Sequence, residues 1–134
     1  MADIAEPDVL ETIPQHILDE LLEPDEKVQL STTTDICLNG AFGTAYLLAT
    51  DHHLIASSPN GTPTSHILRI PLAEISDLEV KDLFGIGLLK ARTTTEGMTI
   101  ARFSKGLNQK FNRITRRLET MVKKARQTEE KIAK

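Results

Sequence analysis

Hydrophobic residues near the end of the chain, between Ser104 and Arg126, follow a helical period. They recur at steps of three and four, which places one apolar residue per turn on a single face of a helix. Ser104 precedes the first turn and is expected to cap it with its hydroxyl group. The pattern predicts one amphipathic helix that closes a body of strands, and its apolar face contains Leu107, Phe111, Ile114, Leu118, Met121, Val122 and Ala125.

Between Lys27 and Phe103 the pattern changes to alternation, which is typical of strands with one buried face. Turn signals separate the alternating runs, among them Asn39-Gly40 and Glu96-Gly97. Short strands at this spacing leave almost no room for crossover helices, so the pattern favours a sandwich or partly open barrel. The seven expected strands span residues 27–34, 43–50, 53–58, 66–70, 78–83, 88–94 and 98–103.

A second, shorter helix is predicted before the strands. Thr12 followed by Gln15 is a capping-box pattern, and Pro14 is tolerated in a first turn. The helix carries a narrow apolar stripe, which needs a surface to pack on, and it is expected to end near Pro24. We therefore expect a mobile acidic tail over residues 1–11, one domain over residues 12–126 and a polar helical connector over residues 127–134.

Composition limits the class of protein. A chain of 134 residues that is 40% hydrophobic is expected to form one core and one domain. No apolar run approaches the roughly 18–20 residues of a membrane-spanning helix, and the first residues lack the pattern of a signal peptide. The single cysteine, Cys37, excludes an internal disulfide. These features predict a cytoplasmic location.

Charge is distributed unevenly along the chain. Residues 1–26 contain nine acidic residues and no Lys or Arg, whereas residues 105–134 contain ten basic and three acidic residues, a difference of +7. The simplest interpretation is two solvated segments that attract or stay in water. Nucleic acid is not an expected partner, because the basic helix lacks aromatic residues for base stacking outside its apolar face. A surface near anionic lipid is the alternative, formed by Lys110, Arg113, Arg116, Arg117, Lys123 and Lys124.

No catalytic, metal-binding or cofactor-binding site is predicted. His52 and His53 are adjacent, so on a strand they would point to opposite faces; together with His66 they are interpreted as surface histidines. The glycine-containing segments 40–43 and 85–87 lack the Lys-Ser/Thr of a phosphate-binding loop. No serine has the setting of a hydrolase nucleophile. Catalysis, metal ions and cofactors are therefore not expected.

Three large apolar residues lie in glycine-flanked loops and are candidates for contact with a partner: Phe42, Phe84 and Ile86. Core packing is the favoured interpretation for Phe42, because it opens a strand. For Phe84 and Ile86 core packing and partner contact are equally favoured. An unpaired strand edge would offer a partner a second route, by strand addition.

Three segments also carry a family resemblance. Residues 46–55 form an apolar strand followed by Thr-Asp, a histidine pair and Leu; residues 70–75 form a proline turn; residues 83–104 combine Gly85, Gly87 and Arg102-Phe103-Ser104. The set, followed by Phe111, resembles bacterial pleckstrin-homology-like (PH-like) domains, in which the usual pair is Arg or Lys. The resemblance covers residues 9–125 and implies a seven-stranded PH-like barrel or sandwich with a C-terminal helix.

The closest form of that resemblance is to the PH-like domain that precedes the membrane part of certain bacterial ABC exporters. It implies a noncatalytic accessory or regulatory domain at the inner face of the cell membrane, with an adjoining transporter domain as its partner. A stand-alone PH-like adaptor for a protein, a peptide or an anionic membrane surface is the alternative, and a small hydrolase ranks behind it. Phosphoinositide binding of the usual PH type is not expected, since residues 38–43 contain no basic residue.

Overall fold

The structure is a computed structural model that describes residues 10–58 and 66–133. Side chains are described within these ranges except at His66 and residues 129–133. The expected loop at Pro59 to Pro63 and residues 1–9 of the expected acidic tail lie outside the described residues. No helix in the described ranges is both long enough and apolar enough to cross a membrane.

Within residues 10–58 and 66–133, seven strands form one antiparallel sheet, in the spatial order β4-β3-β2-β1-β7-β6-β5. The sheet is not closed, because β4 and β5 are its two edges. The prediction of a mainly β fold with seven strands and a C-terminal helix is confirmed. The strands are β1 (Leu30–Ile36), β2 (Phe42–Ala49), β3 (His53–Ser58), β4 (His66–Pro71), β5 (Ile75–Leu83), β6 (Ile86–Thr93) and β7 (Gly97–Ser104).

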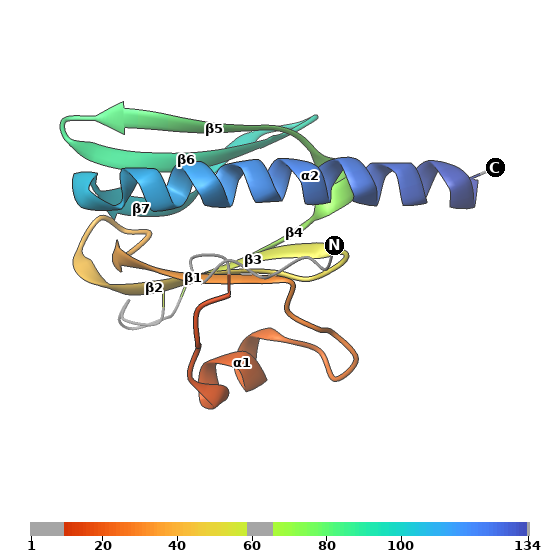
Figure 1. Cartoon of the computed structure of the whole chain (residues 1–134), viewed down its shortest axis with the longest axis horizontal. Helices are drawn as coiled ribbons and strands as arrows, with labels where there is room; N and C mark the ends of the chain where they lie inside the picture. Colours follow the sequence, from red (N-terminus) through yellow and green to blue (C-terminus); the bar gives the residue numbers. More distant parts are fainter. Residues whose placement is uncertain (1–9, 59–65, 134) are drawn as a thin grey trace, which may run out of the picture.

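The sheet folds over into two layers, one of β1 to β4 and one of β5 to β7 (Figure 1). The fold line is the short contact between β1 and β7, where Ile36 lies opposite Arg102. Two hydrogen bonds hold this junction. Arg102 Nε donates to Leu38 O at 2.8 Å, and the Ser104 N–H donates to Asp35 Oδ1 at 2.9 Å.

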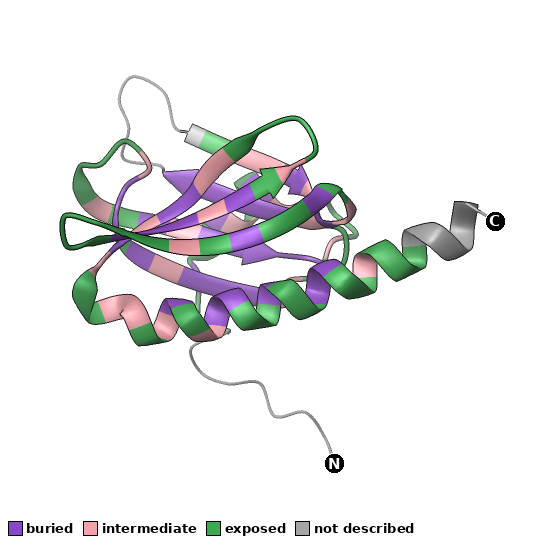
Figure 2. Ribbon diagram, turned by 90° about the horizontal axis from the view of Figure 1, so that it is seen from above, coloured by how far each residue is buried: buried purple, intermediate pink, exposed green. Residues whose placement is uncertain are grey.

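A long helix, α2 (Asn108–Ala133), crosses the open side between the two layers (Figure 1). The predicted apolar face is confirmed: five of its members are buried, and exposed residues alternate with them along the helix (Figure 2). The predicted capping role of Ser104 is wrong. A 3-10 turn, η2 (Lys105–Leu107), intervenes, and the Ser104 side chain makes no capping hydrogen bond to it. The five buried residues are Phe111, Ile114, Leu118, Met121 and Val122.

Two stacked aromatic rings form the centre of the contact between α2 and the sheet. Phe103 of β7 and Phe111 of α2 are both fully buried, with ring centroids 4.1 Å apart and planes inclined by 6°. Gly87 of β6 lies opposite Phe103, and a Cβ atom at Gly87 would approach Phe103 Cε2 to 2.1 Å. Gly87 is therefore required by the close approach of the ring.

The short helix α1 (Gln15–Leu21) packs on the outer face of the β1–β4 layer (Figure 1). Ile17 and Leu21 of α1, together with Ile13 just before the helix, form a second apolar cluster with Leu48 and Ile55. The prediction of a helix with an apolar stripe is confirmed, but its start at a Thr12 capping box is wrong. Pro14 is the N-cap, without a side-chain hydrogen bond, and its carbonyl accepts the first helical N–H groups.

The first described residues are bound to β1. Leu10 forms a parallel bridge with Ser31, the Glu11 N–H donates to Ser31 O at 2.9 Å, and Ser31 Oγ donates to Glu11 O at 2.6 Å. Leu10 and Glu11, which the sequence assigns to a mobile tail, therefore belong to the folded domain. The acidic character of a segment does not predict its backbone pairing.

Candidate interaction surface

The β5–β6 hairpin ends in a two-residue turn, Phe84-Gly85, between the paired residues Leu83 and Ile86. Both turn residues have positive φ, 54° for Phe84 and 84° for Gly85, as in a type I′ turn. Asp82 Oδ1 accepts the Gly85 N–H at 2.9 Å. The turn is well formed, but it places a phenylalanine where asparagine or aspartate is the usual residue.

Phe84 is the most exposed large apolar residue of the described chain, at 98%. Phe42, at the start of β2, is 89% exposed, so the expectation that Phe42 packs in the core is wrong. Leu83 is 51% and Ile86 is 37% exposed. Phe42 therefore opens β2 without contributing to the core.

These four residues lie at one end of the molecule. In Figure 1 the β1–β2 connection, the β5–β6 turn and the start of α2 are all at the same end. The sheet register agrees: Phe42 is opposite Ile36, Ile36 is opposite Arg102, and Arg102 is opposite Leu88, which is the third residue after the β5–β6 turn. We call Phe42, Leu83, Phe84 and Ile86 the apolar tip.

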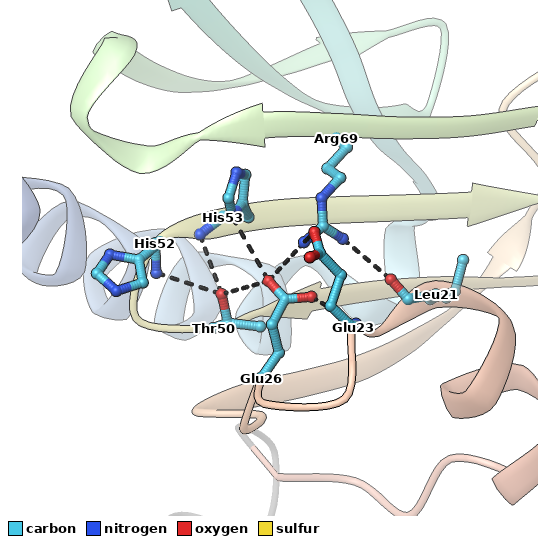
Figure 3. Close-up of polar contacts among 7 residues, drawn as sticks. All are labelled: Leu21, Glu23, Glu26, Thr50, His52, His53 and Arg69. Carbon is cyan, nitrogen blue, oxygen red and sulfur yellow. Dashed lines mark hydrogen bonds and ion pairs between the residues drawn. The ribbon is translucent and has the colours of Figure 1, made fainter.

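Two of the predicted surface histidines, His52 and His53, lie beside a polar cluster around Glu26, in the α1–β1 connection (Figure 3). The side chain of His66 lies outside the described side chains. The Glu26 carboxylate is 11% exposed, and its Oε2 atom lies 2.5 Å from Arg69 Nη2. Arg69 also donates to Leu21 O at 3.0 Å and to Glu23 Oε1 at 3.1 Å. Arg69 therefore attaches the end of α1 and the connection after it to β4.

His53 faces the same carboxylate. Its Nδ1 atom lies 3.5 Å from Glu26 Oε2 and is the one buried side-chain nitrogen or oxygen of the described residues without a hydrogen bond. The backbone N–H groups of His52 and His53 donate to Thr50 Oγ1, which completes the turn between β2 and β3. No three His, Cys, Asp or Glu side chains in the described ranges are grouped closely enough to hold a metal ion. The cluster around Glu26 therefore joins the α1–β1 connection to β3 and β4.

A second polar cluster connects the first described residues with α2. Lys110 Nζ donates to Glu11 Oε1 at 2.9 Å and to Thr33 O at 2.8 Å, and the Lys110 side chain is 15% exposed. Lys110 therefore does not belong to the exposed basic surface that the sequence predicts. Arg113 is half-buried, whereas four members of that surface are exposed: Arg116, Arg117, Lys123 and Lys124.

The carboxylates in these clusters have lowered pKa values. Burial would raise the pKa of Glu11, but hydrogen bonds from Thr32, Lys110 and Thr33 outweigh burial and hold the pKa below its ordinary value of 4.5. Burial of Glu26 is likewise outweighed by Arg69. The pKa of Asp35 is lowered in the same way by hydrogen bonds from Ser104.

These shifts predict a loss of stability in acid. A carboxyl group whose pKa is lower in the folded protein than in the unfolded chain stabilises the fold above its unfolded pKa, and this contribution disappears as the pH falls through the folded pKa. The free energy of unfolding should therefore decrease below about pH 4.5, the ordinary value for Glu11 and Glu26. Urea unfolding measured from pH 7 down to pH 3 would show the decrease.

A matched pair of variants isolates the contribution of Glu11. Glu11→Gln removes a carboxylate that is hydrogen-bonded in the fold, so it should make the decrease with pH shallower. Glu20→Gln removes an exposed carboxylate from α1 and is the control. Equal pH profiles for both variants and the unchanged chain would contradict the role assigned to Glu11.

Neither polar cluster is predicted from the sequence. Glu11 and Lys110 are 99 positions apart, and Arg69 is 46 positions from Glu23. The opposite charges of the two chain ends are the one relevant signal, and they indicate attraction without indicating a partner. The apolar tip is predicted in part, since Phe84 and Ile86 are identified by their glycine-flanked loops.

No family model matches the chain, and no curated protein matches it.

Proposed function

We propose that this chain is a noncatalytic interaction domain and that the apolar tip is its contact surface. The observation that carries the proposal is Phe84, a residue that is 98% exposed and has a φ of 54°. Positive φ costs an L-residue with a large side chain roughly 1–2 kcal/mol, and an exposed ring recovers none of that cost within its own fold. A partner that covers the ring would recover it.

The neighbouring residues support a contact surface at this end. Leu83 and Ile86 flank the β5–β6 turn and are also exposed, and Phe42 is exposed at the same end of the molecule. Exposed apolar surface of this kind is typical of contacts with other proteins or domains. Aromatic residues are enriched at the centre of such contacts, where they bury much area for little loss of side-chain freedom.

The setting that we propose is the N-terminal PH-like domain of a bacterial ABC exporter, with an adjoining transporter domain as the partner at the inner face of the membrane. The order of seven antiparallel strands and a terminal helix is the order that this resemblance implies. Any transport or ATPase activity would reside in sequence beyond this chain. A stand-alone adaptor is the alternative setting for the same apolar tip.

Replacing Phe84 by asparagine should stabilise the isolated domain and weaken its contact. Asparagine tolerates positive φ, so Phe84→Asn should raise the free energy of unfolding by about 1 kcal/mol. Thr94→Asn, in the exposed β6–β7 turn where φ is not positive, is the control and should change stability by less than about 0.5 kcal/mol. Denaturant unfolding measures both values. A destabilised Phe84→Asn would mean that the ring packs on its own domain.

The contact itself is tested in the complete protein that the gene encodes. A photo-crosslinking residue in place of Phe84 should react with a domain or protein outside residues 1–134, whereas the same residue in place of Thr94, at the opposite end of β6, should not. Equal crosslinking at both positions, or none at Phe84, would overturn the apolar tip as a contact surface.

The proposed place of this domain in an exporter is tested by the sequence of the gene that encodes it. Membrane helices followed by nucleotide-binding motifs downstream of the Lys134 codon would support the exporter. A stop codon there would rule out the exporter and leave the adaptor, without changing the expected result for Phe84.

A further inference from the structure

Two neighbouring strands carry large apolar residues on the outer face of the sheet. Leu48 lies between Leu47 and Ala49, which belong to the main core, and successive side chains of a strand point to opposite faces. Leu48 therefore points away from the main core. Ile55 lies directly opposite Leu48 in the β2–β3 pair, and both residues are fully buried. Another part of the chain must cover this apolar face.

The cover is residues 10–26, which we call the strap. Ile17 and Leu21 of its helix α1 pack with Leu48 and Ile55 in a cluster separate from the main core. The helix has seven residues and no side-chain cap, whereas an isolated helix shorter than about 12–15 residues is marginal even in a favourable sequence. α1 is therefore helical because it is docked on the sheet.

The strap is held at its two ends by ion pairs with other elements. At its first end, Glu11 Oε1 accepts a hydrogen bond from Lys110 Nζ of α2 at 2.9 Å. At its last residue, Glu26 Oε2 lies 2.5 Å from Arg69 Nη2 of β4. Both pairs are partly accessible to water, so salt weakens them, and neither belongs to the core of the sheet. The contacts of the strap can therefore break while the sheet remains folded.

We propose that the strap is an autoinhibitory cover, which opens as one unit and uncovers a docking face for an amphipathic helix of a partner protein. The docking face consists of Leu48, Ile55 and Arg69. It is separate from the apolar tip, because Leu48 lies near the end of β2 whereas Phe42 opens that strand. The proposal is thus independent of the function assigned to the tip.

The strap itself indicates the chemistry of the partner helix. Its apolar residues Ile13, Ile17 and Leu21 are four positions apart, and acidic Glu26 follows the helix and pairs with Arg69. A helix with this spacing and an acidic residue beyond its C-terminal end matches the docking face in shape and charge. The strap of a second copy is disfavoured as the occupant: it would make the same contacts as the chain's own strap, which is tethered nearby at a high effective concentration.

Hydrogen exchange of the unchanged full chain tests whether the strap opens independently. The Leu18 and Leu22 N–H groups donate to Pro14 O and Leu18 O within the strap. They should exchange at least about tenfold faster than the paired amides of β1 and β2, with almost no dependence on denaturant concentration, because local opening exposes little surface. Equal rates with equal denaturant dependence would overturn the strap as a unit that opens by itself.

A synthetic peptide of residues 10–26, added to the full chain, is the probe for the docking face. Ile17→Ser weakens the strap and leaves the face unchanged, so this variant should bind the peptide at least about tenfold more tightly than the unchanged chain does. Glu20→Ser, on the exposed side of α1, is the matched control and should bind the peptide no better than the unchanged chain. Bound peptide should shift the NMR signals of Leu48 and Ile55.

A charge exchange tests the role of Arg69. Arg69→Glu, added to Ile17→Ser, should weaken peptide binding about tenfold or more. A peptide in which Glu26 is replaced by arginine should recover binding to this double variant. Arg92→Glu, at an exposed position of β6, is the control in the same background and should change the affinity by less than about twofold.

Three further outcomes would overturn the proposal. Binding of the peptide to both Ile17→Ser and the unchanged chain with equal affinity, or to neither, would contradict a covered docking face. Loss of the folded NMR signals of β6 and β7 in Ile17→Ser would show that the strap belongs to the cooperative core. A dimer of the unchanged chain in sedimentation, abolished by Ile17→Ser, would show that copies exchange their straps and that the occupant is not a partner helix.

Discussion

Phe111→Ala is expected to lower the free energy of unfolding by about 3–5 kcal/mol. The Phe111 side chain is fully buried and its ring stacks on Phe103 with a centroid separation of 4.1 Å. Removing the ring would leave a cavity between α2 and β7, bounded by Ile114 and other core residues that are themselves fully packed. The expected loss has two parts. The variant no longer gains the free energy of burying the ring, and the cavity that remains adds a cost of its own.

The matched control is Asn112→Ala, the next residue on α2, which is exposed. It should change stability by less than about 0.5 kcal/mol. Denaturant unfolding of both variants gives the comparison. Equal, small effects would mean that α2 is not part of the cooperative core, and the closing role of the helix would then be wrong.

Gly87→Ala is expected to be the second large effect, a loss of about 3 kcal/mol, at the upper end of the range for overpacking. The added Cβ would lie 2.1 Å from Phe103 Cε2, far inside contact distance. The ring cannot move away freely because Phe111 stacks on it with nearly parallel planes. Either the ring or the β6 backbone must shift, and the packing of α2 shifts with it.

The control is Gly97→Ala in β7, where the added Cβ would meet only Ala91 O, at 4.0 Å. This variant should remain close to the unchanged chain in denaturant unfolding. A double-mutant cycle then identifies the clash: Phe103→Leu removes part of the ring, so Gly87→Ala should cost less in that background than alone. Additive losses would show that Gly87 acts through its backbone and not through the ring.

The sequence pattern predicts the elements of this fold because each has a strong local period. The 3.6-residue period of α2 identifies its buried side, and alternation locates all seven strands to within a few residues. Local turn chemistry was informative at Asn39-Gly40, where the chain turns and Gly40 has a φ of 93°. It was misleading at the helix starts, since Thr12 and Ser104 have suitable side chains, but the N-cap of α1 is Pro14 and η2 intervenes between Ser104 and α2.

The candidate surfaces depend on which strands become neighbours. The exposure of Phe42 depends on which segments pack beside the start of β2, and nothing local to Phe42 encodes that. The same reason explains Lys110, which sits on the polar face of α2 yet is covered by Glu11 and Thr33. Pairing between distant residues leaves no periodic trace in either segment.

The sequence by itself determined the fold class, the number of strands and the apolar face of α2. It also identified Phe84 and Ile86 as candidates for contact with a partner. Only the tertiary structure decided which edge of the sheet stays open, that Gly87 lies under the Phe103 ring and that the apolar tip gathers at one end. The physical reason is the distance along the chain over which each effect acts. The periodicity of apolar residues and the preferences of turn residues act over a few positions, whereas strand order and packing depend on contacts between segments far apart in the sequence.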